Sequence, residues 1–303
     1  MASAVLSASR SSIYEVVTAQ IVAAIEKGAG SFVMPWHGGI VPMSMPLNAL
    51  TENPYRGINV VSLWAQAAVR LYPTGYWATY DQWRKLGGQV RKGERGSAIV
   101  FYKRQDEDDG DDPQDEAVAS RTVLRHSHVF NFAQVDGWEL PDEAKRPSEV
   151  VPNEQIAAFI HATKADIRHG GYRAYYHVQE DYIAMPDRES FRDTPTRSAT
   201  EGYYAVLLHE LTHWTGAQHR LDRARGKRFG DRGYAFEELV AELGAAFLCS
   251  AFRLVNLPRP DHAAYIANWL DTLNRDKRAI FVAASLAQQA VEYLRSLAGS
   301  DQP

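Results

Sequence analysis

Residues 207–221 read LLHELTHWTGAQHRL, and the H-E-x-x-H string that begins at His209 decides which kind of fold to expect. On a helix, positions i and i+4 share one face, so the imidazoles of His209 and His213 can reach one divalent metal ion. Glu210 then lies beside that ion, where a carboxylate can take a proton from a bound water. Apolar residues precede the motif and Gly216 follows it, which predicts a packed helix that ends at this glycine.

The third metal ligand defines the class of site, and the sequence offers two candidates. His219 completes an H-E-x-x-H-x-x-G-x-x-H string, but the metzincin class also requires a methionine turn, and no methionine follows the motif. The other candidate is a carboxylate in EELVAELGA, residues 237–245, where Glu238 and Glu242 share a helical face. This stretch fits the gluzincin pattern, which places Glu238 on the metal and uses Glu242 to hold a ligand histidine through its far nitrogen. His219 remains the alternative ligand.

The remaining polar residues near this motif have expected roles as well. Three protein ligands leave a fourth position for water, with Glu210 as its base; Zn²⁺ is the expected ion and Mn²⁺ the alternative. Tyr234 and His177 are candidates for stabilising an oxyanion, although each is more often structural at such positions. We expect Glu237 to face away from the metal and to be solvated.

Composition limits the class of protein. With 303 residues, of which 45% are hydrophobic, the chain can form one large or two ordinary domains around a sizeable core. The one cysteine, Cys249, lies in the apolar stretch GAAFLCSAF, so we expect a buried structural thiol and no internal disulfide. The first residues lack the basic segment of a signal peptide, and no run of about 18 apolar residues occurs. We therefore expect a cytoplasmic protein with no membrane partner.

Charge is distributed unevenly along the chain. Residues 1–105 contain 11 Lys and Arg against 5 Asp and Glu, whereas residues 106–120 contain 8 acidic residues and no basic one. The net charge of the whole chain is only −4. A basic first part that ends in an acidic run suggests a polyanionic partner for the first part.

Aromatic residues alternate with basic and amide residues in this basic part. Single-stranded nucleic acids bind to such surfaces because bases stack on aromatic rings along a cationic track. Five of the seven tryptophans precede residue 141, and among them we assign Trp64, within INVVSLW, to the core. The residues that we expect to contact single-stranded DNA are Trp36, Tyr55, Arg56, Asn59, Trp77, Tyr80, Gln82, Trp83, Lys85, Arg91 and Lys92.

Hydrophobic periodicity divides the chain into two parts. It predicts helices over 11–27, 58–70 and 154–165, a short helix within 76–88, strands over 96–103 and 121–135, and short strands near 172–178 and 181–186. An acidic loop over 106–119 separates two strands that can pair, and the proline-rich stretch 141–155 is the best linker. We therefore predict an α+β protein with a mixed α/β single-stranded-DNA-binding domain, residues 1–145, and a mostly helical, gluzincin-like metallopeptidase domain, residues 146–303.

Long motifs in both parts support a family assignment. The stretches P-W, P-L-N, Y-R-G-I-N-V-V-S-L-W and G-Y-W-A-T-Y-D-Q-W resemble the N-terminal domain of the ArdC-type antirestriction proteins of conjugative plasmids. H-E-L-T-H-W-T-G, R-L-D-R and Y-A-F-E-E-L-V-A-E-L-G-A-A-F-L resemble their zincin-like domain, so the resemblance covers about residues 10–300. It implies single-stranded-DNA binding and protection of incoming plasmid DNA from host restriction enzymes. Carried over by position, it also implies metal ligands at His209, His213 and Glu238, with Glu210 as the catalytic residue.

Two other functions fit the same motifs. One is a DNA-dependent protease that cleaves DNA-bound proteins, similar in logic to SprT-type repair proteases, with a host restriction protein or another DNA-bound protein as substrate. The other is a DNA-binding protein with a purely structural metal. A structural zinc site usually closes with four protein ligands, so Glu210 favours a catalytic site.

Overall fold

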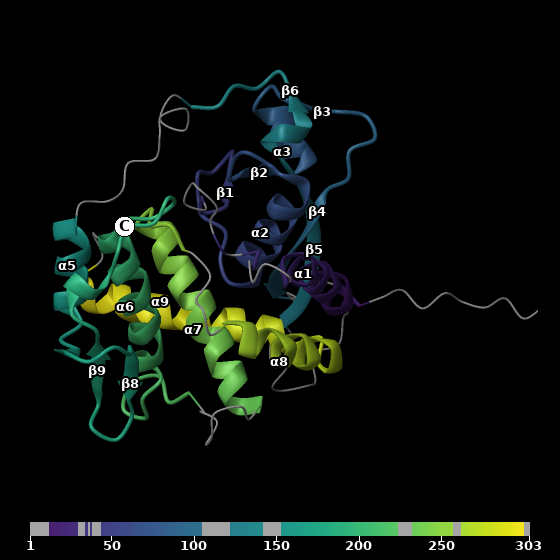
Figure 1. Cartoon of the computed structure of the whole chain (residues 1–303). Helices are drawn as coiled ribbons and strands as arrows, with labels where there is room; N and C mark the ends of the chain where they lie inside the picture. Colours follow the sequence, from purple (N-terminus) through teal and green to yellow (C-terminus); the bar gives the residue numbers. More distant parts are fainter. Residues whose placement is uncertain are drawn as a thin grey trace, which may run out of the picture.

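The computed structural model describes residues 12–29, 34–35, 37, 44–104, 122–141, 153–223, 232–256 and 262–299. Three sequence predictions fall outside these residues: the DNA contact at Trp36, the acidic loop over 106–119, and most of the expected linker, residues 142–152. Within the described residues, helices and small sheets alternate in both halves of the chain, as the α+β prediction requires (Figure 1).

The first half contains a four-stranded sheet in the order β1-β2-β5-β4. β1 and β2 are parallel, whereas β2–β5 and β5–β4 are antiparallel, and β4 pairs with β5 across the acidic stretch as the sequence predicts. β3 and β6 form a separate antiparallel pair. The elements are α1 (Ile13–Ala29), β1 (Leu47–Asn48), α2 (Ile58–Arg70), β2 (Tyr76–Ala78), α3 (Tyr80–Lys85), β3 (Gln89–Val90), β4 (Ser97–Arg104), β5 (Thr122–Asn131), η1 (Phe132–Gln134) and β6 (Val135–Asp136).

The second half is mostly helical, with a three-stranded sheet in the order β7-β9-β8. β7 pairs with β9 in parallel and β8 pairs with β9 antiparallel. None of the described helices combines the length and the hydrophobicity that a membrane-spanning segment needs. The elements are α5 (Asn153–Ala162), β7 (Asp166–His169), β8 (Tyr175–His177), β9 (Tyr182–Met185), η2 (Arg188–Ser190), α6 (Ala199–Thr215), α7 (Arg232–Ala251), α8 (His262–Arg275) and α9 (Ala279–Ala298).

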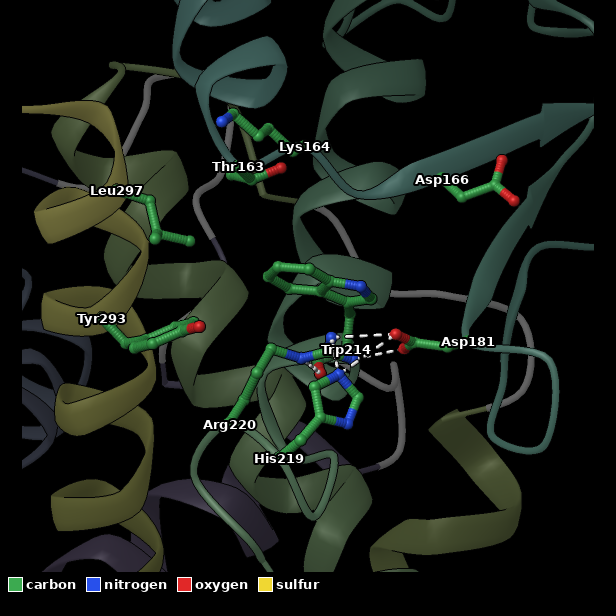
Figure 2. A pocket seen from close by; sticks show the side chains of 9 residues that line it. All are labelled: Thr163, Lys164, Asp166, Asp181, Trp214, His219, Arg220, Tyr293 and Leu297. Atoms are coloured by element: carbon green, nitrogen blue, oxygen red, sulfur yellow. Dashed lines mark hydrogen bonds and ion pairs between the residues drawn. The ribbon is translucent and has the colours of Figure 1, made fainter.

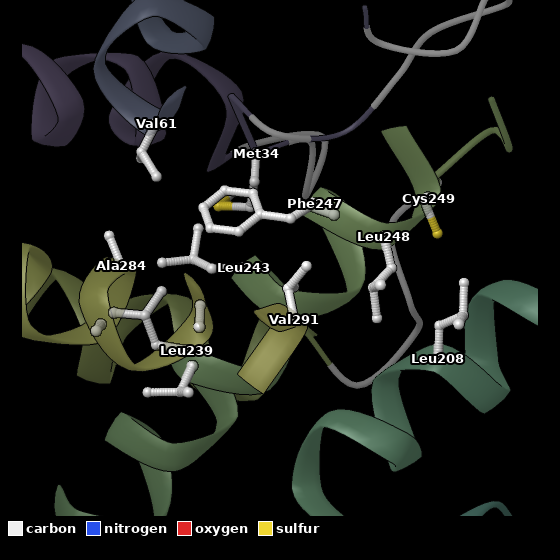
Figure 3. Packing of buried hydrophobic residues seen from close by; sticks show 14 of the residues in the cluster. Met34, Val61, Leu208, Leu239, Leu243, Phe247, Leu248, Cys249, Ala284 and Val291 are labelled. Atoms are coloured by element: carbon white, nitrogen blue, oxygen red, sulfur yellow. The ribbon is translucent and has the colours of Figure 1, made fainter. Parts of the chain in front are cut away.

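One apolar cluster extends through both halves of the chain. It joins residues of α1 and α2 to residues of α6, α7, α8 and α9, and Figure 3 shows Met34 and Val61 from the first half beside Phe247 and Ala284 from the second. Trp64 is 2% exposed and its ring packs on Phe247, which confirms its assignment to the core. The halves are therefore held together by burial of apolar surface, and each supports the position of the other.

Candidate metal centre

The H-E-x-x-H motif lies in the second part of helix α6. The helix begins at a capping box, in which the Ser198 side chain accepts from the Glu201 backbone N–H and the Glu201 side chain accepts from the Ser198 N–H. Its C-cap is Gly216, as the sequence predicts. His209 and His213 are both buried, at 2% and 8% exposure, so the motif faces the interior rather than the solvent.

Helix α7 approaches α6 closely at a glycine. A Cβ atom on Gly244 would come within 2.5 Å of Thr212 Cγ2, a distance that no real Cβ contact shows. The missing side chain therefore allows α7 to pack tightly against the helix that carries the motif. The carboxylates of Glu237, Glu238 and Glu242 on α7 are buried in consequence.

Three side chains from these two helices converge on one point. One potential ligand atom from each of His209, His213 and Glu238 lies within 4.8 Å of the other two, and all three residues are buried. Glu238 Oε2 is 3.6 Å from His209 Nε2, and Glu238 Oε1 is 3.4 Å from His213 Nε2. Tetrahedral bonds of about 2.0–2.1 Å place ligand atoms about 3.3 Å apart, so this donor set fits a zinc-type ion.

Each histidine also contacts a second carboxylate through its other ring nitrogen. His209 Nδ1 is 3.2 Å from Glu242 Oε1, which is the arrangement that the sequence predicted for Glu242. His213 Nδ1 is 3.3 Å from Glu237 Oε1. With a carboxylate beside its Nδ1, each imidazole can present its Nε2 to a metal, and the carboxylate restricts how the ring can turn.

The position of Glu237 corrects the prediction that this residue is solvated. Glu237 is only 5% exposed, because α7 turns it toward His213 rather than outward. Arg223 anchors it with two bonds, of 2.8 Å from Nη2 and 3.2 Å from Nε, and also donates to the Thr215 hydroxyl. Helical spacing alone did not reveal this role, because Arg223 lies outside both helices.

The charges of these groups are strongly coupled. Burial opposes the charged form of His213, but Glu238 and Glu237 outweigh it and raise the pKa of His213 to about 9. Burial likewise opposes the charge of Glu237, yet its bonds to His213 and Arg223 lower its pKa to about 2. Glu238 also remains ionised, because His213 and His209 lower its pKa in spite of burial. A buried, anionic carboxylate between two imidazoles is suited to a divalent cation.

The proposed base and the oxyanion candidates differ in their surroundings. Glu210 follows His209 on α6 and is 3% exposed. Tyr234 precedes Glu238 by one helical turn, and burial together with the nearby Glu238 carboxylate raises the pKa of its hydroxyl. His177 lies on β8, where its ring stacks on Tyr182 at 5.0 Å. Tyr234 is therefore the candidate that the structure places beside the ligand set.

His219, the alternative ligand, contacts a different group of residues. Its side chain is 63% exposed and its Nε2 is 3.2 Å from Asp181 Oδ2. Arg220 also donates to His219 Nε2, at 2.7 Å, and binds Asp181 (Figure 2). These residues line a pocket of about 350 Å³ beside Trp214, at the end of α6. Among the described residues, the metal-type cluster includes Glu238 and not His219.

Two of the tryptophans expected to stack on DNA bases belong to the core, which corrects the expectation for them. Trp77 and Trp83 are 1% and 0% exposed. The Trp83 ring meets Trp138 at 5.0 Å, and its Nε1–H donates to the Phe130 carbonyl. A base cannot reach either ring unless the surrounding structure opens. Sequence spacing could not distinguish a packed aromatic from an exposed one.

Several other residues that we predicted to contact DNA form hydrogen bonds within the protein or are largely buried. Asn59 bonds to the backbone of Val100 in both directions, and Gln82 completes the capping box of α3. Burial raises the pKa of the Tyr55 hydroxyl to about 12. The remaining predicted contacts lie at the surface, where Arg56 pairs with Glu292, Arg91 pairs with Glu94 and Asp136, and Tyr80, Lys85 and Lys92 are exposed.

The fold and the site define a class of protein, and comparisons with known proteins identify the family. A family model described as zincin-like metallopeptidase matches residues 154–286, so the second half is a metal-binding zincin-like domain. A model described as the N-terminal domain of anti-restriction factor ArdC matches residues 11–130. The chain belongs to the ArdC antirestriction family and has its two-domain architecture.

Relatives and solved structures agree with this assignment. Protein y4eC of Sinorhizobium fredii is 46% identical over 288 residues, which are 94% of this chain and 92% of that protein. DNA primase TraC of Escherichia coli is 32% identical over 296 residues, 93% of this chain but 27% of that protein. The metal-free crystal structure of ArdC from plasmid R388 has 42% identity, covers 97% of this chain and 100% of its own, and gives a TM-score of 0.78. The Mn(II)-bound structure of the same protein has 40% identity, covers 96% of this chain and 100% of its own, and gives a TM-score of 0.76.

Proposed function

We propose that this protein binds single-stranded DNA through its N-terminal domain and protects incoming plasmid DNA from restriction with the help of a metallopeptidase-type site. The observation that carries the proposal is the buried set of His209, His213 and Glu238, joined in one chain to an ArdC-type N-terminal domain. We assign residues 1–145 and 146–303 to the two domains. The two R388 ArdC structures, one of them containing Mn(II), support a divalent metal at this set, with Zn²⁺ or Mn²⁺ as the ion.

The residues of the site divide the chemistry between them. When bound by His209, His213 and Glu238, the ion would supply Lewis acidity and lower the pKa of a water. We assign Glu210 the role of removing the proton from that water, because it follows a ligand histidine in the sequence and is not itself in the ligand set. Tyr234 can donate a proton or a hydrogen bond to a developing oxyanion, since its raised pKa keeps the hydroxyl protonated. A peptide or protein is the substrate class that fits this arrangement.

The proposed DNA surface uses the exposed members of the predicted set. Lys85, Lys92 and Tyr80 are exposed on and after α3, so two ammonium groups and one ring are accessible to a strand. Arg91 has its own acidic partners, yet it is also exposed and can exchange them for phosphate. Because this contact is ionic, its strength should fall with salt.

The alternative, a protease that acts on DNA-bound proteins, shares the ligand set and differs in its target. In that case a host restriction protein is one substrate among other DNA-bound proteins. A purely structural metal is disfavoured, because structural zinc sites usually close with four protein ligands, whereas the set formed by the described residues supplies three.

A transfer assay tests the proposal. A plasmid that carries restriction sites is transferred into a restricting host with wild type, Glu210→Gln or Glu154→Gln, where Glu154 is an exposed carboxylate on α5. We expect Glu210→Gln to keep metal, fold and DNA affinity and to lose protection, because removing a general base costs about 10²–10⁴-fold in rate. Glu154→Gln should protect like wild type. Full protection by a metal-loaded Glu210→Gln protein would refute the catalytic role and show that DNA binding alone is sufficient for protection.

A further inference from the structure

A histidine from the first half of the chain reaches the carboxylate that supports the metal site. The side chain of His37 is 0% exposed, and its Nε2 lies 3.6 Å from Oε2 of Glu242 on α7, a carboxylate that is itself only 4% exposed. His37 and Glu242 are far apart in the sequence. No sequence motif pointed to His37, because it lies between α1 and β1, outside the described helices and strands.

The backbone near His37 fixes which nitrogen carries the proton. Met34 donates its backbone N–H to His37 Nδ1 at 3.0 Å. A nitrogen that accepts a hydrogen bond is not protonated, so the proton of the neutral ring is on Nε2. The protonated Nε2 of His37 therefore lies 3.6 Å from Oε2 of Glu242, an electrostatic contact that is longer than a hydrogen bond.

The second oxygen of the same carboxylate contacts a metal-type ligand. Glu242 Oε1 is 3.2 Å from His209 Nδ1, while His209 Nε2 faces Glu238. The two oxygens of the Glu242 carboxylate thus face different imidazoles, so the contact with His37 restricts how Glu242 can turn. The orientation of the His209 ring depends on Glu242 in turn.

Packing between the two halves holds His37 in place. The Trp64 ring of α2 packs on Phe247 of α7 at 5.8 Å, and its Nε1–H donates to the Ser44 carbonyl at 2.9 Å. His37 also forms part of the wall of a largely apolar cavity of about 460 Å³, together with Trp64 and Leu63. In such apolar surroundings the interaction between the His37 dipole and the carboxylate is only weakly screened.

We propose that His37 is a positioning residue through which the N-terminal domain orients the metal site, acting on His209 by way of Glu242. The inference rests on the proposed metal site. It assigns a defined contact between the ArdC-type domain and the zincin-like domain, and it predicts that metal affinity depends on a residue of the N-terminal domain.

A pair of amide substitutions tests this role in the full-length protein. His37→Asn keeps an acceptor for the Met34 N–H but its donor is too short to reach Glu242, whereas His37→Gln extends a donor toward it. We measure the dissociation constant for Mn²⁺ by calorimetry and the melting temperature without metal. We expect about 10-fold weaker binding in His37→Asn, at the lower end for an outer partner of a ligand. His37→Gln should stay within about threefold of wild type, since it restores the donor to the same carboxylate.

Two controls separate positioning from packing. Leu63→Ala removes apolar volume beside the same cavity and should lower the melting temperature without changing the Mn²⁺ dissociation constant. In a Glu242→Gln background, His37→Asn should have almost no further effect on Mn²⁺ affinity, because the carboxylate through which His37 acts has already been removed.

Equal Mn²⁺ affinity in wild type and His37→Asn, equal loss in both amide variants, or independent effects of His37→Asn and Glu242→Gln would each overturn the inference. If Glu238→Ala binds Mn²⁺ as tightly as wild type does, the proposed metal site itself is refuted.

Discussion

Replacing Gly244 by alanine tests whether the close contact of α6 and α7 is what assembles the ligand set. The new Cβ would lie 2.5 Å from Thr212 Cγ2, whereas ordinary contacts begin at 3.4 Å. Because Thr212 is fully buried, the helices must separate by about 1 Å. We take overpacking of this severity to cost about 2–3 kcal/mol.

The gain in helix propensity opposes this cost. Alanine is favoured over glycine inside a helix by about 1 kcal/mol, which leaves a net loss of about 1–2 kcal/mol. At about 2–4 °C per kcal/mol for a protein of this size, the melting temperature should fall by about 2–8 °C. Metal affinity should fall too, since separation of the helices opens the distance of 3.4 Å between His213 Nε2 and Glu238 Oε1.

Gly202→Ala is the matched control on α6. A Cβ atom there would meet the Arg197 side chain at 3.4 Å, an ordinary contact, so this variant should melt at or above the wild-type temperature. Wild type, Gly244→Ala and Gly202→Ala are compared by thermal melting with and without Mn²⁺. If Gly244→Ala is as stable as Gly202→Ala and binds Mn²⁺ like wild type, the close contact does not control the site.

Four further predictions follow from the environments described above. Trp83→Ala should lose about 3–5 kcal/mol of stability, measured by denaturant unfolding, because the ring is a fully buried core residue. Lys92→Ala should leave stability unchanged and make the salt dependence of single-stranded-DNA binding less steep by about 0.7 in log–log slope; an unchanged slope would remove Lys92 from the interface. The hydrogen bond from Arg220 lowers the pKa of Asp181 to about 2, so Asp181 stabilises the fold above about pH 4, and the difference in melting temperature between wild type and Asp181→Asn should shrink from pH 4 to pH 2. Burial raises the pKa of the Cys249 thiol to about 12, so a thiol reagent should label it only after denaturation, and rapid labelling of the native protein would contradict its burial.

Local sequence patterns were sufficient for the main elements and the ligand set. The periodicity of residues 58–70 predicted α2 with the observed bounds, because a helix of this length buries one apolar face. Spacing of four residues placed His209 with His213 and Glu238 with Glu242, since a helix fixes which side chains share a face. Burial of Cys249 followed from its apolar neighbours.

Contacts that depend on how elements pack could not be predicted in the same way. Glu237 is on the same helix as Glu238, but its burial is explained by Arg223, which lies after α6 and before α7. Trp77 packs with Leu63 and Val129, and Trp83 packs with Val90 and Val135. Most of these partners are distant in the sequence, so local patterns do not reveal that the two rings are buried. β1, β3 and β6 are two residues long, too short for any alternating pattern.

Metal stoichiometry of single variants is the decisive test of whether His209, His213 and Glu238 bind the metal. Glu238→Ala and His219→Ala are purified without chelator, titrated with Zn²⁺ and Mn²⁺, and compared with wild type, with circular dichroism to confirm folding. We expect about one ion in wild type and in His219→Ala and sharply reduced binding in Glu238→Ala, because Glu238, unlike His219, lies within reach of both His209 and His213. An empty site in folded His219→Ala, together with full occupancy in Glu238→Ala, would contradict it.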